Sequence, residues 1–300
     1  MKKAFSLIEV IFVLVILGIV ASISSQIIVQ VYESYITQQA IYKVSIKTEL
    51  AINQIVNRLT YSVVGSAIAK DESNSSNYKL LTDLDLTTDT DLTVLEWIGY
   101  DNDSFSAGST PYWSGVANYE DANESMFETP GSQLGKVDTI IKNLSKSISL
   151  DSNTSSQRPA VIFQPRTGAG DAINGECMGL VNNDTSCIYA VSEKNATGFS
   201  FEDKNKSKII TERYQLAWSA YALVPTLKSN GLYNLNLHYN YQPWEGETYD
   251  KNATSSLLIS NVSVFKFTQS GGIIQLKLCA SENIGTDYNI STCKEKAILR

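Results

Sequence analysis

Histidine is almost absent from this chain, whose 300 residues include one histidine, four cysteines and six prolines. The single histidine, His238, stands in a run of alternating tyrosine and leucine residues, which predicts a position on the face of a strand. A hydrolytic triad therefore lacks its usual base. The chain also lacks the phosphate-binding sequence G-x-x-x-x-G-K-[ST] and the dinucleotide fingerprint G-x-G-x-x-G. We expect no enzymatic activity and no cofactor.

Positive charge is scarce as well. The formal net charge is −7, and loss of two lysines with an N-terminal leader would bring it to −9. An acidic balance argues against a surface that binds nucleic acid through its phosphates. The one short basic run, at residues 204–208, directly follows Glu202 and Asp203 and predicts a solvated turn. We expect a soluble, exported head and no nucleic-acid partner.

No proline occurs between residues 5 and 69, so nothing in this stretch forces a helix to break. Its first part is an apolar run of about 19 residues that ends at Ile23. At a rise of 1.5 Å per residue the run spans roughly 28 Å, close to the hydrocarbon core of a bilayer. Only three polar residues interrupt the run, namely Ser6, Glu9 and Ser22. The sequence predicts a transmembrane segment at about residues 5–25.

Glu9 is the unusual residue of this segment, because a carboxylate in a membrane is costly unless it finds a partner. The run is longer than the apolar part of an ordinary secretory signal, and no clean A-x-A cleavage site follows it. A cut between Ala4 and Phe5 would instead leave the whole apolar helix at the new N-terminus.

The stretch Ala4-Phe5-Ser6-Leu7-Ile8-Glu9-Val10, together with the apolar run after it, resembles the type IV pilin and type II secretion pseudopilin superfamily. The resemblance implies that residues 1–4 are a leader, that a prepilin peptidase cuts between Ala4 and Phe5, and that the amine of Phe5 becomes N-methylated. Glu9 is the fifth residue of the mature chain and takes the place of the family's hallmark glutamate. Ala4 stands where the family usually has glycine. Gln26 stands where many major pilins carry a proline, which fits a minor component better.

Simple electrostatics agrees with the role that the resemblance gives to Glu9. The free amine of Phe5 would be cationic, since the pKa of α-amino groups lies near 7.7–8.0. A neighbouring subunit's amine comes within reach of Glu9 when helices bundle with an axial stagger. Such a buried pair gives register rather than net stability, because both ions lose their hydration.

The resemblance implies a minor pseudopilin or minor pilin, built into a type II secretion or type IV pilus filament. The implied partners are other pilins or pseudopilins, the prepilin peptidase and the inner-membrane assembly platform. The alternative is an uncleaved, membrane-tethered periplasmic binding or adhesion protein, in which Glu9 snorkels or is protonated.

The lysines that precede the apolar run predict a cytoplasmic N-terminus and a periplasmic head at the bacterial inner membrane. Disulfides form in that compartment. Cys177 and Cys187 flank one short loop, and Cys279 and Cys293 flank another, which favours these two pairs among the three possible pairings. Zinc is the rival interpretation, but no C-x-x-C motif accompanies the single histidine.

Beyond the membrane run the pattern becomes amphipathic. Apolar residues recur at three- and four-residue spacing, with Thr48 filling one gap, at Ile41, Val44, Ile52, Ile55, Leu59 and Val63. This predicts one long helix over residues 5–69 that packs its stripe on a sheet. Residues 70–300 then read as short strands separated by turns, with a hairpin turn at 269–272. The expected fold class is α+β, with a mostly antiparallel head.

Four aspartates gather within nine residues, at Asp83, Asp85, Asp89 and Asp91. Calcium favours such clusters, and relatives in the superfamily, chiefly major pseudopilins, bind it. An EF-hand loop, however, needs glycine at its sixth position and glutamate at its twelfth, where this loop has Thr88 and Val94. We expect a solvated turn here and keep these aspartates only as weak calcium candidates.

Overall fold

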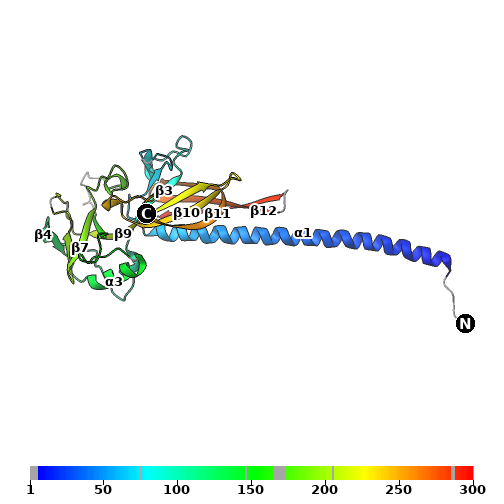
Figure 1. Ribbon diagram of the computed structural model, residues 1–300, viewed down its shortest axis with the longest axis horizontal. Coiled ribbons are helices and arrows are strands. Elements are labelled where there is room, and N and C mark those ends of the chain that lie inside the picture. The colour runs from blue at the N-terminus through cyan, green and yellow to red at the C-terminus, as the bar shows by residue number, and fades with distance from the viewer. Residues whose placement is uncertain are drawn as a thin grey trace.

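A computed structural model describes residues 6–74, 76–145, 147–164, 173–204, 206–284 and 288–299. One long helix leads from the N-terminus into a head built around an antiparallel sheet, so the predicted α+β class is confirmed (Figure 1). This helix, α1, covers Leu7–Thr60, 54 residues, which at 1.5 Å per residue is about 80 Å.

The predicted end of α1 at residue 69 is wrong, because the helix ends at Thr60. The hydroxyl of Ser62 donates to the carbonyl of Leu59 at 2.9 Å, which satisfies one of the orphan acceptors of the last turn. The next backbone N–H, of Val63, donates across to a strand, to the carbonyl of Ile98 at 2.7 Å. The sheet therefore takes over the backbone hydrogen bonds that a longer helix would have used.

The head contains thirteen strands and several short helices within the described residues. The strands are β1 (Ile68–Lys70), β2 (Tyr78–Leu80), β3 (Val94–Tyr100), β4 (Asn118–Asn123), β5 (Met126–Glu128), β6 (Ala160–Phe163), β7 (Tyr189–Asn195), β8 (Gly198–Phe201), β9 (Tyr214–Leu227), β10 (Tyr233–Tyr241), β11 (Thr254–Ser270), β12 (Ile273–Ile284) and β13 (Tyr288–Leu299). The helices are α2 (Asn102–Phe105) and α3 (Leu134–Ser145), and the 3₁₀ turns are η1 (Leu81–Asp83), η2 (Gly175–Cys177) and η3 (Pro243–Glu245).

The long strand β9 organises the sheet. Strand β3 pairs with one of its edges, and β10 and β6 pair with successive parts of the other. The main path runs β13-β12-β11-β10-β9-β6-β7-β8-β5-β4, and β1 joins β3 to β2. All of these pairings are antiparallel. In Figure 1 the strands β11 and β12 extend beside α1 and point back along it.

Several strand boundaries differ from the sequence-based expectation. Strand β11 covers 17 residues rather than a short segment, because a bulge with Asn261 at φ 60° lets the pairing with β10 continue. The C-terminal tail forms the strand β13, which pairs with β12 over 12 residues. Residues 100–135 contain a short helix, α2, as well as the strands β4 and β5.

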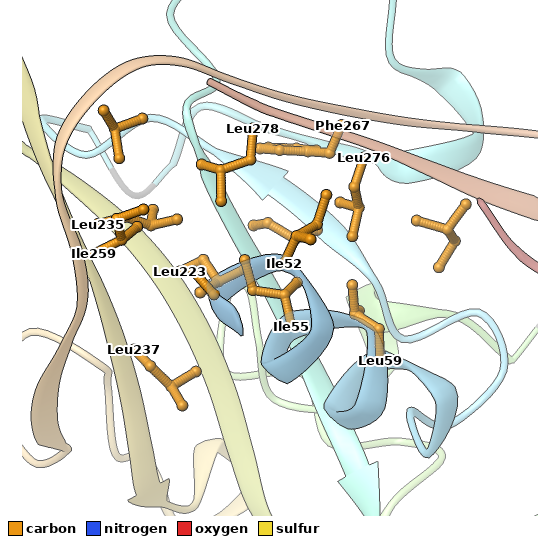
Figure 2. Close-up of a cluster of buried hydrophobic side chains, with 14 of the residues drawn as sticks. Ile52, Ile55, Leu59, Leu223, Leu235, Leu237, Ile259, Phe267, Leu276 and Leu278 are labelled. Atoms are coloured by element: carbon orange, nitrogen blue, oxygen red, sulfur yellow. The ribbon is translucent and has the colours of Figure 1, made fainter. Parts of the chain in front are cut away.

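The second half of α1 packs its apolar stripe on the sheet, as predicted (Figure 2). Ile52, Ile55 and Leu59 point from the helix toward sheet residues such as Leu223 and Leu276. Thr48 fits into the buried stripe because its hydroxyl donates to the carbonyl of Val44 at 2.8 Å. Ile41 lies outside the buried stripe and is 45% exposed.

Two further clusters fill the rest of the head. One lies around Val63, Ile98 and Tyr241. The other is aromatic and lies between α3 and the small strands, where the ring of Phe127 has its centroid 5.3 Å from those of Phe163 and Phe199.

Candidate assembly helix and the head that carries it

The first half of α1 is apolar and exposed around its whole circumference. Within it, Leu7 is 81% exposed and Leu17 is 63% exposed, and no residue from 6 to 35 is buried or half-buried. Among the described residues, α1 is the one helix long and apolar enough to cross a membrane, by length and composition. It is compatible with a single-pass membrane anchor. Fully exposed apolar side chains on this scale require a lipid or protein environment.

Glu9 is the single charged residue between Leu7 and Tyr32. It lies in the first turn of α1, where its N–H donates to the carbonyl of Ser6 at 3.1 Å and its side chain is exposed. A carboxylate at this end of a helix is favoured by the helix dipole. The described residues contain no ion pair to Glu9.

Ala4 and Phe5 lie outside the described residues, so cleavage between them, methylation of Phe5 and its pairing with Glu9 stay predictions. What the structure adds is the surroundings of Glu9. The carboxylate is placed on a helix whose neighbouring surface, at residues 10–23, is apolar for about four turns. Any partner that buries this surface must also supply a cation or a proton to Glu9.

Charged side chains join the middle of α1 to the C-terminal strands. Glu49 lies 3.4 Å from the Nζ of Lys294 and 2.9 Å from that of Lys296, and Lys43 lies 3.6 Å from Glu282. These pairs are partly exposed and contribute little to stability. They do show that β12 and β13 lie beside this part of the helix. The sequence reasoning missed them, because it did not predict β13.

Both predicted disulfides are present. Cys177–Cys187 closes the loop that starts at η2, and Cys279–Cys293 joins directly opposite residues of β12 and β13. None of the described cysteines is free.

An ion pair is buried beneath the first disulfide loop. The Nζ of Lys70 lies 2.5 Å from Glu96 and 2.5 Å from the carbonyl oxygen of Leu180, which belongs to that loop. The hydroxyl of Tyr241 donates to the other oxygen of Glu96 at 2.8 Å. Burial and the neighbouring Glu96 raise the pKa of Tyr241 well above its usual value. All members of this network are buried, so it connects three parts of the head rather than presenting a reactive group to a substrate.

The four aspartates of the weak calcium candidate do not converge. Asp89 binds the Nζ of Lys79 through both oxygens at 2.8 Å, and Lys79 holds the pKa of Asp89 below its usual value. Asp85 accepts from the backbone N–H of Thr87 at 2.8 Å. Asp83 and Asp91 are exposed. The described part of the chain contains no group of three or more His, Cys, Asp or Glu residues arranged to hold a metal.

His238 and the basic run occupy structural positions. His238 lies on β10, with Nδ1 2.9 Å from the carbonyl oxygen of Tyr249 and Nε2 3.3 Å from Ser255. In the basic run, the Nζ of Lys208 donates to the carbonyl of Asp203 at 2.5 Å and lies over the ring of Phe201. These contacts are typical of packing and turn formation.

Comparison with known protein families gives a match at the N-terminus. Residues 1–25 match the family model described as the prokaryotic N-terminal methylation motif. The chain therefore carries a prepilin-type N-terminal methylation motif, and its long apolar helix is consistent with the type IV pilin and pseudopilin superfamily. Comparison with curated proteins and with solved structures found no match.

Proposed function

We propose that this protein is a minor pseudopilin or minor pilin, a structural subunit of a type II secretion or type IV pilus filament. The observation that carries the proposal is the methylation motif at residues 1–25, followed by an apolar helix that the head leaves uncovered. The filament is the environment that would bury this surface. The protein acts by assembly and performs no catalysis.

In this proposal the chain starts as an inner-membrane precursor with its N-terminus in the cytoplasm and its head in the periplasm. Prepilin peptidase removes residues 1–4 and exposes the amine of Phe5, which is then methylated. The inner-membrane assembly platform transfers the helix from lipid into a bundle of pilin helices. There Glu9 pairs with a Phe5 amine and so sets the axial register, because an unpaired carboxylate in the bundle is costly.

The division of α1 supports this mechanism. The buried stripe of Ile52, Ile55 and Leu59 anchors the helix in its own head, whereas the first half keeps its whole surface for other subunits. The head contains most of the chain, and from its size we propose a position at the filament tip. A uniform distribution along sheared filaments, seen by immunogold labelling, would contradict the tip position.

Two measurements test the proposal. Mass spectrometry of the mature protein should find an N-terminus that starts at N-methylated Phe5. Replacement Glu9→Ala should abolish incorporation into sheared filaments, and Glu9→Gln should do nearly the same, because the amide keeps the shape but removes the charge. The matched control is Glu33→Ala, since Glu33 is an exposed acid on the same helix outside the motif.

The contrary outcomes are distinct. Retention of Met1 would favour the alternative, a membrane-tethered periplasmic binding or adhesion protein with an uncleaved anchor. Normal incorporation of Glu9→Ala would refute the register mechanism. Equal losses for Glu9→Ala and Glu33→Ala would show a general effect of charge on the helix.

A further inference from the structure

The acceptor sequence of N-glycosylation recurs along this chain. Eleven asparagines begin the acceptor sequence of N-glycosylation, N-x-[ST], in which the middle residue is not proline. In seven of the eleven, an aspartate or glutamate stands two positions before the asparagine. These seven are Asn74, Asn123, Asn153, Asn195, Asn205, Asn252 and Asn289. Acidic residues make up 31 of the 300 residues, so chance alone would place an acid there in about one of the eleven.

Five of the seven sequences with the acid are described at the acid, the asparagine and the hydroxyl residue, and all five asparagines are exposed, three in turns or loops and two at the end of a strand. Asn74 lies between β1 and β2, Asn153 between α3 and β6, and Asn252 between η3 and β11. Asn123 and Asn195 are the last residues of β4 and β7, next to the turns that lead into β5 and β8. Asn205 and Asp287, the acid before Asn289, lie outside the described residues. The acid two residues before the asparagine is therefore found at exposed acceptors, which a modifying enzyme can reach.

Three of the four acceptor sequences without the acid start in a helix or inside a strand. Asn102 lies in α2, Asn143 in α3 and Asn261 within β11, where regular backbone hydrogen bonds oppose the rearrangement that a modifying enzyme needs. The fourth, Asn183, lies exposed in the loop closed by Cys177–Cys187, with Val181 at the acid position. Asn183 is thus an accessible acceptor that lacks only the acid.

At the acceptor sequences with the acid, the local hydrogen bonds leave the side-chain nitrogen Nδ2 of the asparagine available. The backbone N–H of Ser125 donates to the Oδ1 of Asn123 at 2.9 Å, and that of Ser76 donates to the Oδ1 of Asn74 at 3.2 Å. These turns use the oxygen of the side-chain amide rather than Nδ2, the nitrogen that receives a glycan. At Asn195 the arrangement is less open, because its Nδ2 also donates to Glu128 at 3.2 Å.

We propose that the exported head is N-glycosylated at these turns by a bacterial-type oligosaccharyltransferase that reads the carboxylate two residues before the asparagine. A cation in the transferase would recognise this carboxylate, as charge-assisted pairing does elsewhere. The proposal rests on the proposed function in one respect, namely export of the head to the side of the membrane where such transfer takes place.

The transfer balances with a polyprenyl-diphosphate-linked oligosaccharide as the co-reactant. Nδ2 of the asparagine bonds to C1 of the first sugar while the C1–oxygen bond to the diphosphate breaks. The bonding electron pair of that C1–oxygen bond leaves with the diphosphate, and one amide proton passes to a base of the transferase. No oxidation or reduction occurs.

The five sites are not equivalent. The acid, the asparagine and the hydroxyl residue are all exposed in the sequences around Asn74, Asn123 and Asn252. In the other two sequences the acids, Asp151 and Glu193, are half-buried. We therefore expect the highest occupancy at Asn74, Asn123 and Asn252.

The placement of the acceptors is compatible with assembly. The first asparagine of the chain is Asn53, so no acceptor lies on the exposed apolar half of α1. In Figure 1, β4 and β7, which bear two of the sites at their ends, lie at the end of the head far from the N-terminus. Bulky, solubilising glycans at these turns would leave the helix surface free.

Glycopeptide mass spectrometry of the full-length protein, purified from the cells that naturally make it, tests the proposal. Peptides with Asn74, Asn123 and Asn252 should carry one common glycan mass, and the peptide with Asn183 should carry none. Replacement Asp250→Ala should reduce the glycosylated fraction at Asn252 at least tenfold. The matched control Lys251→Ala changes the neighbouring residue, keeps the acid and should leave that fraction unchanged.

Protease accessibility of the head is measured on intact spheroplasts prepared from the same cells. It distinguishes failure of the glycosylation proposal from failure of the assembly proposal. An accessible head with unmodified asparagines overturns the glycosylation proposal and leaves the assembly proposal intact. An inaccessible head overturns both. Glycosylation of Asn183 to the same extent as Asn252, or no effect of Asp250→Ala, overturns recognition of the acid.

Discussion

The Nζ of Lys70 lies 2.5 Å from the carboxylate of Glu96, and both side chains are almost completely buried in the head. Lys70 comes from β1 and Glu96 from the neighbouring strand β3, where the register pairs Ile68 with Glu96. A buried pair of this kind tolerates removal of both charges better than removal of one, because a single remaining ion loses its compensation.

Replacement Lys70→Met should therefore lower the free energy of unfolding of the head by about 3–5 kcal/mol. The double replacement Lys70→Met with Glu96→Gln should recover a large part of this loss, since the neutral amide needs no counter-ion. Urea denaturation of the detergent-solubilised protein, followed by tryptophan fluorescence, measures both. Additive losses in the double variant would show that the two side chains do not interact.

The same substitution should destabilise the head when made in the second half of α1 and leave its stability nearly unchanged when made in the first half. Ile55 is 2% exposed within the helix–sheet core, and Ile55→Ala should cost about 2–5 kcal/mol of head stability. Ile19 is 55% exposed on the first half, and Ile19→Ala should change head stability by less than about 0.5 kcal/mol. The same urea measurement compares them. Similar losses at both positions would mean that the head covers the first half of the helix.

This contrast shows how much the sequence could predict. The stripe of α1 was visible because its members recur with helical spacing and one side of the helix is buried. The helix end was missed because the backbone N–H of Val63 donates to the carbonyl of Ile98 in the sheet instead of to a helical carbonyl, which no local pattern reveals. Strand β13 was missed because its mostly polar residues, among them Lys294 and Lys296, find partners only when α1 lies beside them.

The site could be predicted only in part for a similar reason. The motif around Glu9 is local and is read directly from the sequence, as is the disulfide spacing. The aspartate cluster looked like a possible ligand set because sequence shows proximity along the chain and not direction. In the structure Lys79, ten residues earlier, binds the carboxylate of Asp89, and the carboxylate of Asp85 accepts from Thr87.

The two disulfides should differ in what they hold in place. Replacement of either cysteine pair by serine should cost about 2–4 kcal/mol, since each bond constrains the unfolded chain. The β12–β13 ladder should keep its hydrogen-exchange protection without Cys279–Cys293, because its backbone pairing runs continuously from Ile273 to Ile284. The loop of Cys177–Cys187 has no such ladder and should lose its protection. Hydrogen exchange with mass spectrometry checks this, and equal loss of protection in both segments would contradict it.

Burial raises the pKa of Asp101 from its ordinary value of 3.8 to about 6. Asp101 caps α2, where its Oδ1 accepts from the backbone N–H of Ser104 at 3.1 Å. Because the folded-state pKa is the higher one, the folded protein binds the proton more tightly than the unfolded chain does. The contribution of Asp101 to stability is then complete below about pH 4 and is lost as the pH rises through 6.

Replacement Asp101→Asn should remove this pH dependence, because asparagine caps a helix comparably and carries no charge. A pKa change of about two units corresponds to about 3 kcal/mol. The variant should match the wild type near pH 4 and exceed its free energy of unfolding by up to that amount at pH 8. Urea midpoints measured from pH 4 to pH 8 check this, with the exposed Asp91→Asn as the matched control. A wild-type profile retained in Asp101→Asn would assign the pH dependence to other groups, of which Glu245, with its pKa raised to about 6 by burial, is the first to test.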